Sequence, residues 1–112
     1  MDKLIGIVGT CAAGKTTLAN HLRQLGFRVK HIAQEHSYVP YMWQRLTNPD
    51  ILIYLEVSYE NTVLRRNLTW TREEFEEQLR RLAHARQHAD LILDTDQIDA
   101  QGVLQKVLDF LT

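Results

Sequence analysis

Apolar residues recur along the chain with two spacings, one typical of strands and the other of helices. Mainly apolar runs at residues 4–8, 51–57 and 91–93 predict buried strands, and residues 27–33 alternate apolar with polar side chains. The unbroken run at 51–57 is typical of a central parallel strand that is covered on both faces. The imperfect alternation over 27–33 predicts an edge strand with one face partly exposed to water.

Between these strands, apolar residues fall at the three- and four-residue spacing of helices. Leu18, Leu22 and Leu25 mark the first helix, and Ser58 is a plausible cap for the third. The predicted helices cover residues 15–25, 40–46, 58–66, 71–88 and 103–111.

The longest of these helices, over residues 71–88, begins with the T-x-x-E spacing of a capping box, Thr71 to Glu74. Two ion pairs at i,i+4 spacing are expected on its exposed face. These pairs are Glu76 with Arg80 and Glu77 with Arg81. The predicted buried stripe consists of Phe75, Leu79, Leu82 and Ala89.

Strands alternate with helices in the order β-α-β-α-β-α-α-β-α. Such an order requires parallel strands joined by right-handed crossovers, with helices on both faces of the sheet. We therefore expect an α/β fold with three layers, α/β/α, around a small, mainly parallel sheet of about four strands. At 112 residues the chain is expected to form one domain, residues 1–112.

The composition limits the classes of partner that the protein is expected to bind. Apolar residues at 45% and charged residues at 24% are ordinary for a globular protein. The net charge of −1 offers no basic face for nucleic acid or an anionic membrane, and no apolar run approaches the roughly 18 residues of a membrane helix. We therefore expect neither nucleic acid nor a membrane as partner. We expect no signal peptide, because the predicted first strand begins at residue 4, and we expect a cytoplasmic setting from the single cysteine, Cys11.

Residues 9–16 have the pattern G-x-x-x-x-G-K-T between the first strand and the first helix, which is the context that a phosphate-binding loop requires. Gly9 and Gly14 allow a tight turn close to an anion. The main-chain amides and the helix dipole would then bind phosphate. We expect Lys15 to reach the β- and γ-phosphates and the Thr16 hydroxyl to ligate Mg²⁺. The predicted nucleotide-binding residues are Gly9, Thr10, Cys11, Ala12, Ala13, Gly14, Lys15, Thr16 and Thr17.

Three stretches together resemble the P-loop kinases of nucleotides and small metabolites, across nearly the whole chain. GTCAAGKTTLA looks like their phosphate-binding loop, and PDILIYLEVSYENTVLRR is similar to the fourth-strand region of thymidylate and deoxynucleoside kinases. HADLILDTDQI looks like the last strand of shikimate and adenylylsulfate kinases. The resemblance implies the P-loop NTPase fold, in a trimmed form, with ATP and Mg²⁺ as cofactors.

The resemblance also implies roles for arginines in a lid over the transferring phosphoryl group, where they offset developing charge. Arg65, Arg66 and Arg72 occupy the matching region. Any one of them is equally compatible with a solvated arginine at a helix end. Contacts to the base are implied for residues 95–98.

A kinase also needs a carboxylate that orients or deprotonates the acceptor hydroxyl. The candidate is Glu35, which follows the second strand at the sheet edge where ligands bind in α/β folds. The alternative is a surface carboxylate. His36 stands where the deoxynucleoside kinases have an arginine, and Arg45 could supply that positive charge.

Two functions remain open. One is a kinase that transfers the γ-phosphoryl group of Mg-ATP to a nucleoside, a nucleotide or a small hydroxylated metabolite. The other is a non-catalytic nucleotide-binding regulator or interaction module, because only about twenty residues separate the second strand from Asp50. The aromatic residues between Tyr38 and Trp43 either cap the core, line the acceptor pocket or form a dimer contact. A homodimer is compatible with the exposed edge strand.

Weaker signals favour structural roles. His84 and His88 are interpreted as part of a polar helix face rather than as a zinc site, which needs three or four ligands. Asp94 and Asp96 are expected to form turns rather than to assist Mg²⁺. Glu56 is expected to cap a helix. For Cys11, the default is a small side chain that fits the loop, and the alternative is a thiol whose oxidation blocks phosphate.

Overall fold

The structure is a computed structural model, and it describes residues 3–67 and 69–112. Its elements follow the predicted order, with one additional 3₁₀ turn, η1, after the second strand. In chain order they are β1 Leu4–Gly9, α1 Lys15–Gln24, β2 Arg28–His31, η1 Gln34–His36, α2 Met42–Leu46, β3 Ile51–Glu56, α3 Tyr59–Arg66, α4 Arg72–His88, β4 Leu91–Asp94 and α5 Ala100–Leu111.

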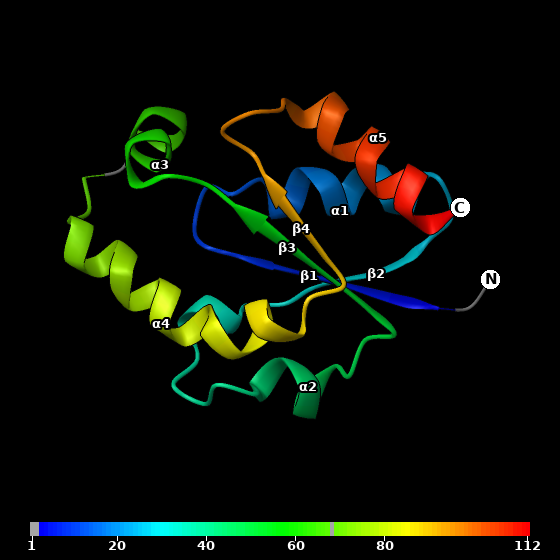
Figure 1. Cartoon of the computed structure of the whole chain (residues 1–112), viewed down its shortest axis with the longest axis horizontal. Coiled ribbons are helices and arrows are strands. Elements are labelled where there is room, and N and C mark those ends of the chain that lie inside the picture. Colours follow the sequence, from blue (N-terminus) through cyan, green and yellow to red (C-terminus); the bar gives the residue numbers. More distant parts are fainter. Residues whose placement is uncertain (1–2, 68) are drawn as a thin grey trace.

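The four strands form one parallel sheet in the order β2-β1-β3-β4. This order confirms the edge position predicted for residues 27–33 and the central position predicted for residues 51–57. In the pairing register, Gly6 lies opposite both Lys30 of β2 and Leu52 of β3. Because the strands are parallel, their carboxyl ends meet at one edge of the sheet, where the loop after β1 also lies (Figure 1).

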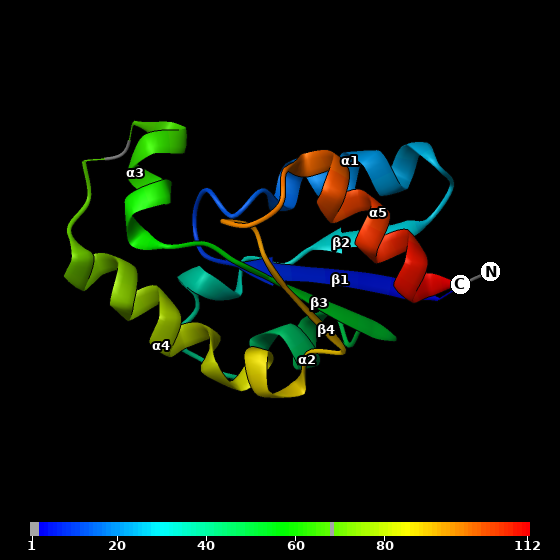
Figure 2. The ribbon, with the colours of Figure 1, turned by 45° about the horizontal axis from the view of Figure 1, so that its top comes forward.

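Helices cover both faces of the sheet, so the fold is the expected three-layer α/β/α arrangement. Figures 1 and 2 show α1 and α5 on one face and α2 and α4 on the other, with α3 beyond the carboxyl ends of the strands. Among the described residues, no helix combines the length and the apolar character that a membrane span requires.

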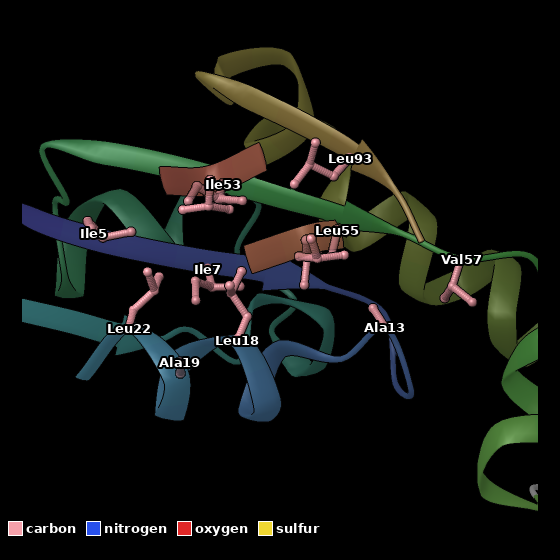
Figure 3. Close-up of a cluster of buried hydrophobic side chains, with 12 residues drawn as sticks. Ile5, Ile7, Ala13, Leu18, Ala19, Leu22, Ile53, Leu55, Val57 and Leu93 are labelled. Carbon is pink, nitrogen blue, oxygen red and sulfur yellow. The ribbon is translucent and has the colours of Figure 1, made fainter. Parts of the chain in front are cut away.

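Each face of the sheet has its own buried cluster, because successive strand residues point to opposite faces. Ile7 and Leu55 face α1 and α5, whereas Val8 and Tyr54 face α2 and α4. The first cluster (Figure 3) contains Ile5, Ile7, Ala13, Leu18, Ala19, Leu22, Ile53, Leu55, Val57, Leu93, Val103 and Val107. The second contains Val8, Ile32, Trp43, Leu52, Tyr54, Leu82 and Ala85.

The predicted caps are present. The amide of Glu74 donates to the Thr71 hydroxyl oxygen (3.1 Å), and the Thr71 amide donates to the Glu74 carboxylate (2.9 Å). Ser58 caps α3 by accepting a hydrogen bond from the amide of Asn61 (3.2 Å). These contacts join residues three apart, so local sequence was sufficient to predict where both helices begin.

The buried side of α4 differs from the prediction. Phe75 and Leu82 are buried as expected, but Gln78 and Ala85 complete the stripe, and Leu79 is 39% exposed. Gln78 takes the inner position because its amide group finds polar partners there, which are described below. Of the two expected ion pairs, Glu77 with Arg81 (3.1 Å) is confirmed, whereas the pairing of Glu76 with Arg80 is wrong, because Arg80 also binds Glu77 (2.7 Å).

Candidate nucleotide-binding site

The loop between β1 and α1 has the geometry for which its two glycines were expected. A Cβ on Gly9 would lie 2.6 Å from the carbonyl oxygen of Leu55, so only glycine lets the loop pass this close to β3. Gly14 precedes α1 and has a φ of 95°, a left-handed conformation that glycine adopts without steric cost. Both glycines therefore keep the loop compact at the amino end of α1.

Lys15 is buried (6% exposed) although it carries a charge. Its Nζ donates to the carbonyl oxygens of Gly9 (2.6 Å) and Thr10 (2.9 Å) and to Oε2 of Glu35 (2.8 Å). An ammonium group has three N–H donors, so all of them are in use. A phosphate oxygen that binds Lys15 would have to replace at least one of these acceptors.

Glu35 lies in η1, directly after β2, and is 4% exposed. This placement confirms that it leaves the carboxyl end of the second strand, and it excludes the alternative of a surface carboxylate. One oxygen binds Lys15, whereas Oε1 is buried without a hydrogen-bond partner among the described residues. Gln34 anchors the turn by donating to the carbonyl oxygens of Val39 (2.9 Å) and Arg81 (3.2 Å).

A cavity of about 490 Å³ opens beside this ion pair. It is lined by residues 11–17 of the loop and by His31, Glu35, His36 and Arg66. Burial, and next the positive charge of Lys15, lower the pKa of His31 below its ordinary value of 6.5. The cavity thus combines main-chain amides, two cationic side chains and one buried carboxylate.

A second cavity, of about 370 Å³, also adjoins the loop and shares residues 12–14 and Thr17 with the first. Its walls include apolar side chains of α1, β3 and α5 and the segment after β4. Arg65 borders it and ties two of its walls together: Nη1 donates to the carbonyl of Ala12 (3.2 Å) and to Oγ1 of Thr95 (3.0 Å), and Nη2 donates to the carbonyl of Thr95 (2.6 Å). Residues 95–98, for which base contacts were implied, contribute Thr95 and Ile98 to this cavity.

The three candidate arginines occupy three different places. Arg66 lines the first cavity and Arg65 the second. Arg72 pairs with Glu60, and its guanidinium lies 4.8 Å from the ring centroid of Tyr59. The structure thus brings Lys15, Glu35 and Arg66 to one cavity and places Arg72 among other partners. A contact of Arg72 with phosphate stays a prediction.

Gln78 is a site residue that the sequence reasoning missed. Its Oε1 accepts a hydrogen bond from the amide of Cys11 (3.0 Å), and its Nε2 lies 3.2 Å from the Cys11 sulfur, to which it donates. A signal was available in the sequence, since Gln78 stands three residues after Phe75 and four before Leu82, on the buried side of the helix. α4 therefore touches the phosphate-binding loop through this glutamine.

The aromatic segment divides into two parts. Trp43 is buried in the second core cluster, and its indole N–H donates to Nδ1 of His84 (3.1 Å). Tyr38 and Tyr41 are exposed, and neither contributes to the lining of the two cavities. His84 is thus partly buried against an aromatic ring, which corrects its interpretation as part of a polar face.

The acidic residues near the ends of β3 and β4 have structural partners. Asp96 accepts hydrogen bonds from the amide of Ser58 (3.1 Å) and from Nδ2 of Asn61 (2.7 Å), and Asp94 accepts one from the amide of Asp96 (3.0 Å). These bonds fit the expected turn-forming roles. Glu56 forms an ion pair with Arg86 (2.8 Å), so its interpretation as a helix cap is wrong.

Comparison with known families supports the interpretation of residues 9–16 as a phosphate-binding loop. A family model described as "AAA domain" matches residues 5–95, a span from β1 through the segment that follows β4. The comparison with curated proteins finds no match. The match covers most of the chain and contains the loop, Glu35 and the candidate arginines. The chain therefore belongs to the AAA domain family, a P-loop NTPase-related family, and is a P-loop nucleotide-binding protein with an α/β fold.

Proposed function

We propose that the protein is a P-loop kinase that transfers the γ-phosphoryl group of Mg-ATP to a nucleoside, a nucleotide or a small hydroxylated metabolite. The observation that carries the proposal is the buried pair of Lys15 and Glu35, 2.8 Å apart, in the cavity beside the phosphate-binding loop. Glu35 compensates the charge of the buried Lys15, and its position in the cavity beside the loop also suits it to accept a proton. Phosphoryl transfer needs both a cation for the phosphate and a carboxylate for the acceptor.

The pair suggests how ATP binding prepares the site. Phosphate oxygens compete with Glu35 for the Lys15 ammonium, and a phosphate that takes this place releases the carboxylate. Glu35 is then available to accept the proton of the acceptor hydroxyl as the oxygen bonds to the γ-phosphorus and the bond to the β–γ bridging oxygen breaks. Arg66, which lines the same cavity, offsets the charge on the transferring group.

The donor set around the loop also fits Mg²⁺. Thr16 lies in the first turn of α1 beside Lys15 and lines the cavity, and its hydroxyl oxygen is a ligand type that Mg²⁺ accepts together with phosphate oxygens. Mg²⁺ would neutralise charge on the phosphates. Thr16 would hold the ion on the loop side, and Lys15 and Arg66 would supply the remaining positive charge.

The second cavity supports a nucleoside as the other half of the donor. It adjoins the loop at residues 12–14, and its walls include Leu18, Ile98 and Val103. Such apolar walls suit the faces of a base, and the Arg65 guanidinium at the rim offers a planar cation to stack against it. Triphosphate in the first cavity and base in the second would place one ATP across the loop.

The test is ATP consumption with a panel of nucleosides, nucleotides and sugars as acceptors. Lys15→Ala is expected to abolish nucleotide binding or turnover with the fold retained, and Lys106→Ala on the exposed surface of α5 is the matched control. Glu35→Gln is expected to lower turnover by about 10²- to 10⁴-fold with nucleotide binding retained, since it removes the proton acceptor but keeps an amide oxygen that can accept from Lys15. ATP affinity and turnover unchanged by Lys15→Ala would contradict the proposal.

The second candidate function is a nucleotide-binding module without phosphoryl transfer. It is favoured by the short segment between β2 and β3, residues 32–50, which leaves little chain to surround an acceptor. Nucleotide binding by the native protein, with no acceptor-dependent ATP consumption for any member of the panel, would select this function. In that case there would be no turnover to compare, and Glu35→Gln could change only the affinity for nucleotide.

A further inference from the structure

Three side chains with metal-binding chemistry converge in the first cavity. Cys11 comes from the phosphate-binding loop, and Glu35 and His36 come from η1. One ligand atom of each (the cysteine sulfur, a carboxylate oxygen and an imidazole nitrogen) lies within 4.8 Å of the other two. All three residues line the cavity.

The buried carboxylate of Glu35 is a second, separate indication of a bound cation. Its Oε1 is buried and has no hydrogen-bond partner in the described part of the chain, while Oε2 binds Lys15. A buried carboxylate oxygen without a partner costs free energy, because water no longer solvates it. A cation bound at this oxygen would remove that cost and leave the contact with Lys15 in place.

The Cys11 sulfur is also held in position. Gln78 binds both the amide and the sulfur of Cys11, at 3.0 and 3.2 Å, and so fixes how the side chain sits at the cavity wall. Partners of this kind are usual around the ligands of protein metal sites.

From this arrangement we propose that Cys11, Glu35 and His36 form a zinc site with one open coordination position. Thiolate, imidazole and carboxylate are the ligands that zinc takes in proteins, and the hard cation Mg²⁺ does not favour thiolate. Bonds of about 2.0–2.3 Å in a tetrahedral site separate the ligand atoms by roughly 3.3–3.7 Å. Nε2 of His36 lies 3.8 Å from Oε2 of Glu35, the carboxylate oxygen beside the proposed ligand Oε1, and the His36 side chain is 60% exposed.

The site has a consequence for nucleotide binding, and this part rests on the proposed function. An ion held by Cys11 and Glu35 occupies the cavity beside the loop, where the terminal phosphate of ATP would lie. A Glu35 carboxylate that binds this ion cannot accept the proton of the acceptor hydroxyl. Zinc and Mg-ATP therefore exclude each other, and zinc inhibits the protein.

The first test uses Co²⁺ alone, added to metal-free and nucleotide-free protein. Co²⁺ replaces zinc and gives a thiolate-to-metal charge-transfer band, and Cys11 is the only cysteine that can produce it. We expect a band that saturates at one ion per chain, disappears in Cys11→Ser and forms at least about tenfold more weakly in His36→Ala and Glu35→Gln. His88→Ala, at an exposed histidine on α4, is the matched control and leaves the titration unchanged.

Two results would contradict the proposed zinc site. One is the absence of a charge-transfer band in the wild-type protein. The other is equal affinity in His36→Ala, Glu35→Gln and wild type, which would reduce the site to the thiol alone. Circular dichroism of each variant checks that the fold is retained, and a variant that unfolds is replaced by His36→Gln or Glu35→Ala at the same position.

The second test measures binding of a fluorescent ATP analogue in excess Mg²⁺, with and without Zn²⁺. Zinc is expected to weaken binding to wild type more than to Cys11→Ser and His36→Ala; chelation of zinc by the nucleotide in solution is the same for all three. An equal effect on wild type and variants would overturn the inhibition. Failure of the analogue to bind without zinc would contradict the proposed function and leave the Co²⁺ result independently readable.

Discussion

At the scale of single residues, the Lys15 ammonium shows how the phosphate-binding loop keeps its shape. Its three hydrogen bonds join the loop to Glu35, which is twenty positions away in the sequence. Without such a partner, a buried cation would carry a large desolvation cost. Glu35 thus has a structural task before any chemistry begins, because it compensates Lys15 in the absence of phosphate.

His31 gives a prediction about pH at the same scale. Burial first, and then the charge of Lys15, lower the pKa of its imidazole in the folded state; Glu35 opposes this shift, and Arg23 adds the smallest lowering effect. The unfolded chain therefore binds this proton first as the pH falls below 6.5. Stability is expected to decrease from there toward the lower folded pKa and to show no contribution from His31 above 6.5.

Urea unfolding at a series of pH values, from about 7.5 to 5.5, measures this effect. His31→Gln should flatten the loss of unfolding free energy on the acidic side relative to wild type. His88→Gln, a histidine substitution remote from the cavity, should retain the wild-type slope. If the unfolding free energy of His31→Gln fell with pH as steeply as that of wild type, the lowered pKa of His31 would not be the cause of the loss.

At the scale of elements, the start of α4 depends on a local device that can be removed cleanly. Thr71→Ala deletes the hydroxyl that accepts from the Glu74 amide, and it should lower the free energy of unfolding by about 1 kcal/mol. Thr71→Ser keeps the hydroxyl and should restore most of the loss. The comparison requires equilibrium denaturation of both variants, and equal stabilities for alanine and serine would show that the cap contributes nothing.

Local devices of this kind explain why the elements could be predicted from sequence. The Thr71–Glu74 box and the Ser58 cap act over three residues, and the apolar run at 51–57 identifies a central strand wherever its neighbours come from. Each of these features is visible in a short window of sequence. The helix and strand order, and from it the layered fold, followed from such windows.

Most of the errors arose where a polar residue found a distant partner; the exception is Arg80, which pairs with Glu77 three residues away. The bonds of Gln78 to Cys11 span 67 positions, the pair of Glu56 and Arg86 spans 30, and Trp43 reaches His84 over 41. Periodicity shows which face of a helix is inward, but it does not show which glutamine or histidine on that face will find a partner. The position of Arg72 beside Glu60 was hidden for the same reason.

At the scale of the whole molecule, the phosphate-binding loop is held from three sides by separate parts of the chain. Glu35 binds it from the end of β2, Gln78 from α4 and Arg65 from α3. The proximity of Lys15 and Glu35 was predictable, because the carboxyl ends of neighbouring parallel strands meet at one edge. The contributions of α3 and α4 depend on how those helices fold back over that edge, which no local pattern specifies.

This arrangement predicts how the whole protein responds to nucleotide. A ligand that binds only the native state adds about 2.7 kcal/mol to the free energy of unfolding at a hundred times its dissociation constant, which corresponds to roughly 10 °C in Tm for a domain of this size. Mg-ATP should therefore raise Tm with increasing concentration, and adenosine, which lacks the phosphates that the loop binds, should raise it far less. Lys15→Ala should remove most of the difference between the two ligands. A shift of equal size for adenosine and Mg-ATP in wild type would mean that the loop does not hold the phosphates, and it would contradict the role assigned to the cavity beside Lys15.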